Sequence, residues 1–372
     1  MKFKKLMALA LAGTLALAIS GCGGSASTSS TDSTEATTEE STDTAAEDTG
    51  DTEAADDEAE EVEVTEEVTE PTGDSYTVGV VQLVQHPALD AATEGFETAL
   101  SDELGDNVEV DVQNAAGDSA QCATIANTFV SSGVDLIMGN ATAALQAAQA
   151  ATADIPVVGT SITDYATALS IDDWSGTTGM NVTGYSDLAP LDQQADMVAE
   201  WFPADTYPNV GILYCTAEPN SKYQSEVITG YLEDEGYTVT EYTFADSNDV
   251  SSVAETACQD SDVIYIPTDN TAASCTGIIR EIALPAKTPI IAGEEGIMEG
   301  CGVATLSISY YDMGYQAGLM AADILENGTD PATTEIGYAK DLTKKYNPQI
   351  CEELGIEPIA GYEAMEVSEE EE

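Results

Sequence analysis

The sequence is poor in positive charge. Its 372 residues include 9 Lys and Arg against 69 Asp and Glu, which gives a formal net charge of −60. A surface of this sign repels phosphate backbones and anionic lipid headgroups. We therefore exclude nucleic acid as a partner, and a densely basic pocket for a phosphorylated ligand cannot be built.

Histidine is almost absent as well, since His86 is the single one in the chain. Zinc sites of the usual Cys/His type and a Ser-His-Asp catalytic triad therefore lack their components. Nucleophilic catalysis needs a base beside an activated nucleophile, and Ser221-Lys222 is too short a match to indicate one. Acidic residues are too abundant for any pair of them to indicate a glycosidase. We expect no enzyme, no cofactor and no metal.

The N-terminus has three lysines within its first five residues, then an apolar run over residues 6–18 and Ile19-Ser20-Gly21-Cys22. This order, with an apolar stretch too short for a stable span, is typical of a secretory signal peptide. The ending resembles the lipobox of bacterial lipoproteins, which implies cleavage after residue 21 and acylation of Cys22. We expect an extracytoplasmic protein anchored to the cell membrane by lipid. An ordinary signal peptide with a chance cysteine is the alternative.

Residues 22–74 consist mainly of small, polar and acidic types, without an aromatic or positively charged residue. Such a segment cannot bury enough apolar area to offset its ordering entropy, so we expect a disordered, extended linker. It would hold a domain away from the membrane, or, alternatively, act as an acidic tail that binds another partner. The last residues, 364–372, form a second acidic tail.

The part in between alternates short apolar runs with helical segments. A strand over 77–84 precedes a helix over 87–104, and a similar series begins again at Asn209-Val-Gly-Ile-Leu-Tyr214. Alternation of this kind predicts parallel sheets covered by helices on both faces. The repetition indicates an α/β fold with two Rossmann-like lobes, although shared βαβ patterning alone could imitate it.

Ligands of such sheets bind beyond the carboxyl ends of the strands, in the cleft between the lobes. The residues expected there are Gln82, His86, Asp90, Asn140, Thr142, Thr160, Ser161, Asn220, Thr268, Asp269, Asn270, Glu294, Glu295 and Tyr310.

These residue types suit a zwitterion. Hydroxyls, an amide and helix N-termini at Asn140, Thr142, Thr160 and Ser161 can hold a carboxylate without arginine. Asp269, with Glu294 or Glu295, can hold an ammonium group. Gln82, His86, Asp90 and Tyr310 would line a pocket for the remainder of the solute. The alternative is that several of these residues only cap helices.

Several motifs occur in a fixed order: Gln82-Leu-Val-Gln-His-Pro-Ala-Leu-Asp90, Asn181-Val-Thr-Gly184, Ser247-Asn-Asp249, Pro267-Thr-Asp-Asn270 and Tyr310-Tyr-Asp-Met-Gly314. Over Tyr76 to Pro358 the chain resembles ABC-transporter solute-binding proteins of the type 1 periplasmic-binding fold, including tryptophan- and other aromatic amino-acid-binding members.

The resemblance implies a monomeric receptor that closes on a small solute, an amino acid, and delivers it to ABC permease subunits. It also implies a hinge of three strands near 181–187, 304–310 and 335–341. The lobes would be 75–183 plus 310–335 and 187–304 plus 340–363. A receptor of the same fold for a sugar or nucleoside, or a surface sensor without a transport role, is the alternative.

After Cys22, six cysteines remain, and on these boundaries Cys122 alone falls in the first lobe. A bridge from it would cross the cleft that must move. We expect Cys122 to be a free, buried thiol, with at most two bridges among the five cysteines of the second lobe.

Overall fold

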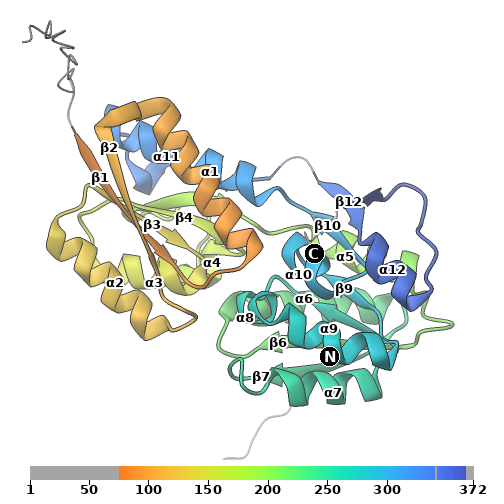
Figure 1. The fold of residues 1–372 in the computed structure, drawn as a ribbon. Coiled ribbons are helices and arrows are strands. Elements are labelled where there is room, and N and C mark those ends of the chain that lie inside the picture. Colours follow the sequence, from red (N-terminus) through yellow and green to blue (C-terminus); the bar gives the residue numbers. More distant parts are fainter. Residues whose placement is uncertain (1–74, 340–341, 366–372) are drawn as a thin grey trace, which may run out of the picture. The chain divides into compact units, whose positions relative to one another are not determined.

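The computed structural model describes residues 75–339 and 342–365. The expected signal peptide, Cys22, the acidic linker and residues 366–372 lie outside the described residues. Two sheets organise the described part, each covered by helices on both faces (Figure 1). Along this part of the chain no helix is long and apolar enough to cross a membrane.

The first sheet has the strand order β11-β5-β4-β3-β1-β2, and all its pairings are parallel. Its strands are β1 (Tyr76–Gln82), β2 (Val108–Asn114), β3 (Leu136–Asn140), β4 (Val157–Ile162), β5 (Val182–Ser186) and β11 (Gly337–Tyr338).

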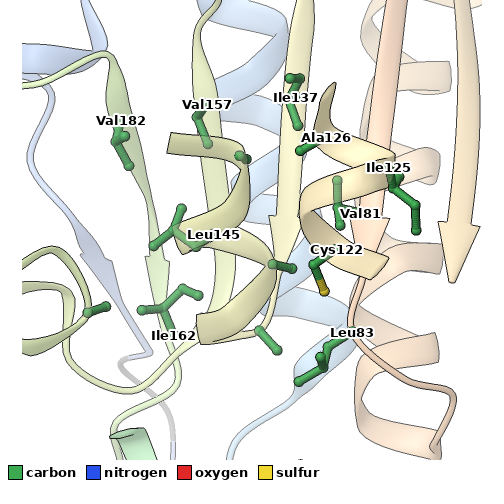
Figure 2. Packing of buried hydrophobic residues seen from close by; sticks show 14 of the residues in the cluster. Val81, Leu83, Cys122, Ile125, Ala126, Ile137, Leu145, Val157, Ile162 and Val182 are labelled. Carbon is green, nitrogen blue, oxygen red and sulfur yellow. The ribbon is translucent and has the colours of Figure 1, made fainter. Parts of the chain in front are cut away.

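Helices α1 (Pro87–Leu104) and α11 (Tyr310–Asn327) lie side by side on one face of this sheet (Figure 1). On the other face lie α2 (Ser119–Ser132), α3 (Thr142–Ala151) and α4 (Tyr165–Leu169). Short 3-10 helices follow α1 (Gly105–Asn107) and α11 (Pro331–Thr333). Figure 2 shows Leu145 of α3 and Ile125 of α2 packed against Val81, Ile137 and Val157 of the strands. This apolar contact holds the start of α3 against the sheet.

The second sheet has the order β13-β12-β10-β9-β8-β6-β7. Its strands are β6 (Asn209–Cys215), β7 (Thr238–Phe244), β8 (Val263–Ile266), β9 (Ile290–Ala292), β10 (Ala304–Ser307), β12 (Thr343–Tyr346) and β13 (Glu363–Ala364). Helices α5 (Leu191–Trp201), α6 (Pro219–Asp234) and α12 (Pro348–Leu354) pack on one face. The other face carries α7 (Val250–Asp260), α8 (Asn270–Ser274), α9 (Thr276–Ala286) and α10 (Glu295–Cys301).

The predicted α/β fold with two lobes of parallel sheet is confirmed. One strand differs from the sequence expectation, because β12 pairs antiparallel with β10. Its sequence, Thr343-Lys-Lys-Tyr346, has no apolar run and its residues are half-buried, so the pattern gave no strand signal there. The chain passes from one sheet to the other between β5 and α5, between β10 and α11, and between β11 and β12.

The six cysteines within 75–339 and 342–365 are all free thiols, and Cys122 is buried. The prediction of a free, buried Cys122 is confirmed. It lies in α2 against the first sheet, where Figure 2 shows its side chain within the apolar cluster. Burial and the neighbouring Asp118 carboxylate raise the pKa of the Cys122 thiol to about 11, so it stays protonated near neutral pH.

Two glycines allow β4 and β5 to approach each other closely. Gly159 pairs with Gly184, whose φ of +148° lies outside the range that side chains favour. A Cβ atom at Gly184 would stand 2.0 Å from the carbonyl oxygen of Gly159 and 2.4 Å from the Tyr165 hydroxyl. No side chain fits there without moving β5, the strand that leads out of the first lobe.

We therefore expect Gly184→Ala to lower the free energy of unfolding by at least about 2 kcal/mol, because the methyl group meets backbone atoms that cannot yield. Gly230→Ala is the matched control, since a Cβ there in α6 meets nothing within 4 Å. That change should be neutral or stabilise by up to about 1 kcal/mol through helix propensity. Urea denaturation measures both, and equal effects would contradict the packing argument.

Candidate ligand-binding site

The polar residues at the strand ends of the two lobes meet across one cleft. Nε2 of His86, after β1, lies 3.2 Å from Oδ1 of Asn270, after β8. Nε2 of Gln224 in α6 lies 3.5 Å from Oγ1 of Thr163, after β4. Because parallel strands end at a common edge, the loops beyond β1, β3 and β4 face those beyond β6, β8 and β9.

In the first lobe a chain of hydrogen bonds fixes the predicted side chains. Gln82 Nε2 donates to Asp90 Oδ1 at 2.6 Å, and Thr93 Oγ1 donates to Gln82 Oε1 at 2.6 Å. Asn140 Nδ2 donates to Thr93 Oγ1 at 3.0 Å, and Asn140 Oδ1 accepts from Ser161 Oγ at 2.8 Å. Asp90 is exposed while the other four are buried. The chain therefore links the ends of β1, β3 and β4 into one rigid surface.

Two residues on this surface have strained backbones. Ala141 and Ser161 have backbone φ values of 87° and 58°, which residues other than glycine rarely adopt. Such strain costs about 1–3 kcal/mol per residue and clusters at ligand clamps. Here it lies where β3 turns into α3 and near the end of β4.

The start of α3 can receive an anion. No side chain caps this helix, so the N–H groups of its first turn, beginning at Thr142, keep their positive partial charge. Thr160 pairs with Asn140 in the adjacent strand, and its buried Oγ1 has no hydrogen-bond partner among the described residues. The chain has no lysine or arginine between Lys5 and Lys222. An anion here would be bound by backbone and hydroxyl groups alone.

Two of the three acidic candidates in the second lobe, Asp269 and Glu294, cap helices. Asp269 accepts from Ala272 N at the start of α8 and from Cys215 N, each at 2.7 Å. Glu294 accepts from Gly296 N at 2.7 Å and from Ile297 N at 2.5 Å, at the start of α10. Both carboxylates are buried. The capping role that the sequence left open for Asn140, Thr142 and Asp269 is thus present in Asp269 alone of the three, and Glu294 caps a helix as well.

Burial disfavours the ionised form of both carboxylates and so raises their pKa values. Burial, and next the nearby Glu218 carboxylate, raise the pKa of Asp269. Burial raises the pKa of Glu294 to about 7 against the backbone N–H bonds that lower it. Glu295 is different, because it is half-exposed and its Oε1 lies 2.6 Å from Lys345 Nζ. Glu295 therefore already has a cationic partner, unlike Asp269 and Glu294, although it lines a cavity together with Pro87 and Tyr310.

Glu218, at the start of α6, organises the remaining residues of the second lobe. It accepts from the backbone N and Nδ2 of Asn270 at 3.0 and 2.8 Å and from Thr271 N at 2.8 Å. Asn220 Nδ2 donates to the carbonyl oxygen of Thr268 at 2.8 Å. These bonds hold the loop after β8 against the start of α6.

Asp187 is a site residue that the list of candidates from the sequence omits. It follows β5 in the first passage between the lobes and is 3% exposed. Tyr310, which begins α11, donates its hydroxyl to Oδ2 of Asp187 at 2.9 Å, but the buried Oδ1 has no partner within the described residues. Burial raises the pKa of Asp187 to about 6, and the Asp187 charge acts on Glu294. None of the four described ion pairs includes either carboxylate.

Asp187 is absent from that list because the candidates follow strands expected inside each lobe, whereas residues 181–187 were expected to form a hinge strand. Residues at the end of this hinge strand would have included Asp187. Across the described residues, five buried side-chain polar atoms lack a partner, and three lie here: His86 Nδ1, Thr160 Oγ1 and Asp187 Oδ1. Their concentration in one cleft indicates that the cleft receives a polar ligand.

Two α/β lobes joined by three passages, with polar strand ends facing each other, define a solute-binding protein of the periplasmic-binding type. The sequence profile of the family described as ABC transporter substrate binding protein matches residues 77–361. The chain belongs to this family, whose members bind small solutes outside the cytoplasm and work with ABC permeases.

Individual relatives agree with this assignment. The chain is 36% identical over 282 residues to the tyrosine-binding protein of Clostridioides difficile, covering 73% of this chain and 81% of that protein. It is 32% identical to an ABC domain from Streptococcus pneumonia solved in complex with L-Trp, covering 78% and 100% of the two chains with a TM-score of 0.74. It is 33% identical to the ligand-free, open structure of a Clostridium difficile substrate-binding protein with adhesive properties, covering 79% and 100% with a TM-score of 0.60.

The position of Asp187 predicts that Asp187→Asn stabilises the solute-free protein. A rise in pKa from 3.8 to about 6 means that stability is full below pH 3.8 and is lost as pH rises through 6. The ionised form thus costs roughly 2–3 kcal/mol of folding free energy at pH 7. The variant should be more stable than wild type by up to about that amount at pH 7, with the difference vanishing near pH 4. Urea denaturation at both pH values measures this, and a variant less stable at pH 7 would contradict it.

Proposed function

We propose that this protein is the lipid-anchored, extracytoplasmic receptor of an ABC importer and binds an amino acid with an aromatic or apolar side chain. The observation that carries the proposal is the polarity of the cleft. The uncapped start of α3 and the unpartnered hydroxyl of Thr160 lie in the first lobe. Asp187 in the passage after β5 and Glu294 at the start of α10 are buried carboxylates that no described ion pair includes. A zwitterionic solute compensates both.

The carboxylate of the solute would lie at the start of α3. Thr142 and the next N–H groups of that helix, with the hydroxyl of Thr160, are the donors, while Ser161 uses its one O–H on Asn140 and only lines the site. Asn140 accepts from Ser161 and donates to Thr93, so the strand ends that carry Thr160 and precede α3 are fixed before the solute arrives. Such preorganisation reduces the ordering cost of binding.

The ammonium group would lie at Asp187, with Glu294 beside it. This proposal differs from the sequence expectation, which gave the ammonium to Asp269 with Glu294 or Glu295. Asp187 is preferred because its buried Oδ1 is free, whereas both oxygens of Asp269 accept backbone N–H groups. Glu294 contributes charge through lone pairs that its two capping bonds leave available.

Closure of the lobes on the solute is the mechanism we infer. A solute that contacts the start of α3 in one lobe and Glu294 in the other can satisfy both only when the cleft is shut, so it stabilises the closed state. The TM-score is 0.74 to the relative in complex with L-Trp and 0.60 to the open, ligand-free relative, although the sequence identities are 32% and 33%. This difference supports a closed arrangement of the two lobes in the structure. The two relatives that bind tyrosine and L-Trp support an aromatic solute.

Two alternatives remain distinct from this proposal. A receptor of the same fold for a sugar or nucleoside would bind a solute with no cation for Asp187 and Glu294. A surface protein without a transport role is favoured by the relative with adhesive properties. Anchoring through Cys22 and delivery to a permease belong to the proposal and are tested separately, by mass spectrometry of the mature N-terminus and by uptake.

Calorimetric titration of the purified chain with L-tyrosine, L-tryptophan, L-phenylalanine, their N-acetyl derivatives, glucose and adenosine tests the solute class. We expect binding of free aromatic amino acids and a loss of at least about 10-fold on N-acetylation, because the charge-assisted hydrogen bond to Asp187 disappears. Binding of glucose or adenosine in preference to every amino acid would replace the proposal with the first alternative.

The ammonium assignment predicts that Asp187→Asn weakens binding of the preferred amino acid by about 10- to 150-fold, since a charge-assisted hydrogen bond contributes about 1.5–3 kcal/mol. Glu295→Gln is the matched control, because Glu295 is half-exposed and paired with Lys345. It should change affinity less than about 3-fold, as expected of a partly solvated ion pair. Unchanged affinity in Asp187→Asn would remove Asp187 from the site and leave the receptor function standing.

A further inference from the structure

We propose that His86 accepts a hydrogen bond from the side chain of the solute, so that the cleft selects aromatic amino acids carrying a donor, a phenol O–H or an indole N–H, over phenylalanine. The inference rests on the proposed amino-acid-binding function and names the side-chain class that the function leaves open. It depends on the order of hydrogen bonds that leads from Glu218 to His86.

The first step fixes the orientation of Asn270. Its Nδ2 donates to Oε2 of Glu218 at 2.8 Å, beside its own backbone N–H, which donates to the same oxygen at 3.0 Å. Thr271 holds the other oxygen of Glu218 with its N–H and its hydroxyl, at 2.8 and 2.7 Å. The amide nitrogen of Asn270 therefore faces Glu218, and its carbonyl oxygen, Oδ1, faces the opposite lobe.

The second step fixes the tautomer of His86. Oδ1 of Asn270 is only an acceptor, so the hydrogen bond at 3.2 Å requires a proton on His86 Nε2. Burial lowers the pKa of His86 below its ordinary value of 6.5, against the Asn270 bond and the Glu218 and Asp90 charges that raise it. The ring is then neutral near pH 7, and Nδ1 carries a lone pair.

The third step concerns this lone pair. His86 is 6% exposed, and its Nδ1 has no hydrogen-bond partner in the part of the chain that the structure describes. A buried acceptor without a donor is costly, by about 1–3 kcal/mol. A solute group with an O–H or N–H removes this cost, whereas a hydrocarbon ring edge leaves it in place. The site therefore discriminates between these two kinds of side chain.

The donor that His86 requires is distinct from the ammonium group. The proposed function places the ammonium group at Asp187, in the passage after β5, whereas His86 lies before α1 and is bonded to Asn270 at the start of α8. The solute must present an ammonium group at one end and a neutral donor at another. Tyrosine and tryptophan have this arrangement, and phenylalanine lacks the second group.

A cavity of about 140 Å³ adjoins Asn270, the hydrogen-bond partner of His86, although His86 itself is not one of its lining residues. Leu83, Val84 and Ala143 bound it from the first lobe, and Glu218 and Asn270 bound it from the second. A cavity of roughly 150 Å³ accommodates benzene in an engineered protein core. The apolar wall from the first lobe suits the face of an aromatic ring, while the polar wall suits a donor at its edge.

The test compares affinities of the full chain for L-tyrosine, L-phenylalanine and O-methyl-L-tyrosine by calorimetry. Wild type should bind L-tyrosine at least about 10-fold more tightly than either analogue, because both lack the donor. His86→Leu should bring L-tyrosine and L-phenylalanine to within about 3-fold of each other, mainly by weakening L-tyrosine. Gln85→Leu, a change at the exposed neighbouring residue, should keep the wild-type ratio.

A second measurement needs no substitution. Since His86 is the single histidine, ¹⁵N-histidine labelling gives one pair of ring signals, which report the tautomer directly. We expect the Nε2–H tautomer, with L-tyrosine shifting the Nδ1 signal and L-phenylalanine leaving it unchanged. An Nδ1–H tautomer, an unmoved Nδ1 signal with bound L-tyrosine, or equal affinities in wild type would overturn the inference alone. No binding of any aromatic amino acid would overturn the inference together with the aromatic solute class of the proposed function.

Discussion

Buried carboxylates that pair with no lysine or arginine of the described residues are the constraint on which the site depends. Asp187 and Glu294 are buried, and none of the described ion pairs includes them. A carboxylate in such a place raises its pKa or must be held by dipoles. Glu294 is held by two backbone N–H groups, one on each oxygen, whereas Asp187 accepts the Tyr310 hydroxyl on Oδ2, has Thr163 nearby and keeps a buried Oδ1 without a partner among the described residues. Asp187 is therefore the less compensated of the two and the stronger attraction for a cationic group.

Helix starts give the cleft its direction. In the second lobe the starts of α8 and α10 are neutralised by Asp269 and Glu294, which act as caps. In the first lobe no side chain caps α3, and its start keeps a partial positive charge. The lobes therefore present opposite signs without one lysine or arginine in the first. Under the proposed function this arrangement would orient a zwitterion with its carboxylate toward α3, so an acidic chain could bind an anionic group without a basic side chain.

Periodicity and breakers predicted the lobes and their helices well, and the bounds of α1 agree residue for residue with the expected 87–104. The same signals could not predict β12, whose register depends on pairing with β10 rather than on its own apolar pattern. They also could not separate the roles of Asp269 and Asp187. Both are aspartates after strands, and what distinguishes them is whether a neighbouring backbone N–H happens to reach the carboxylate, which is a tertiary property.

In the proposed mechanism, the position of Asp187 couples closure of the lobes to its own charge. Asp187 lies in the passage after β5, and its partner Tyr310 begins the helix after the second passage, so their bond joins two of the three connections. Ionised Asp187 destabilises the arrangement that buries it, and an ammonium group removes that penalty. Removing the charge by substitution would relieve the same penalty without a solute. Stability and affinity should then change in opposite directions in one variant, which a purely structural role for Asp187 would not produce.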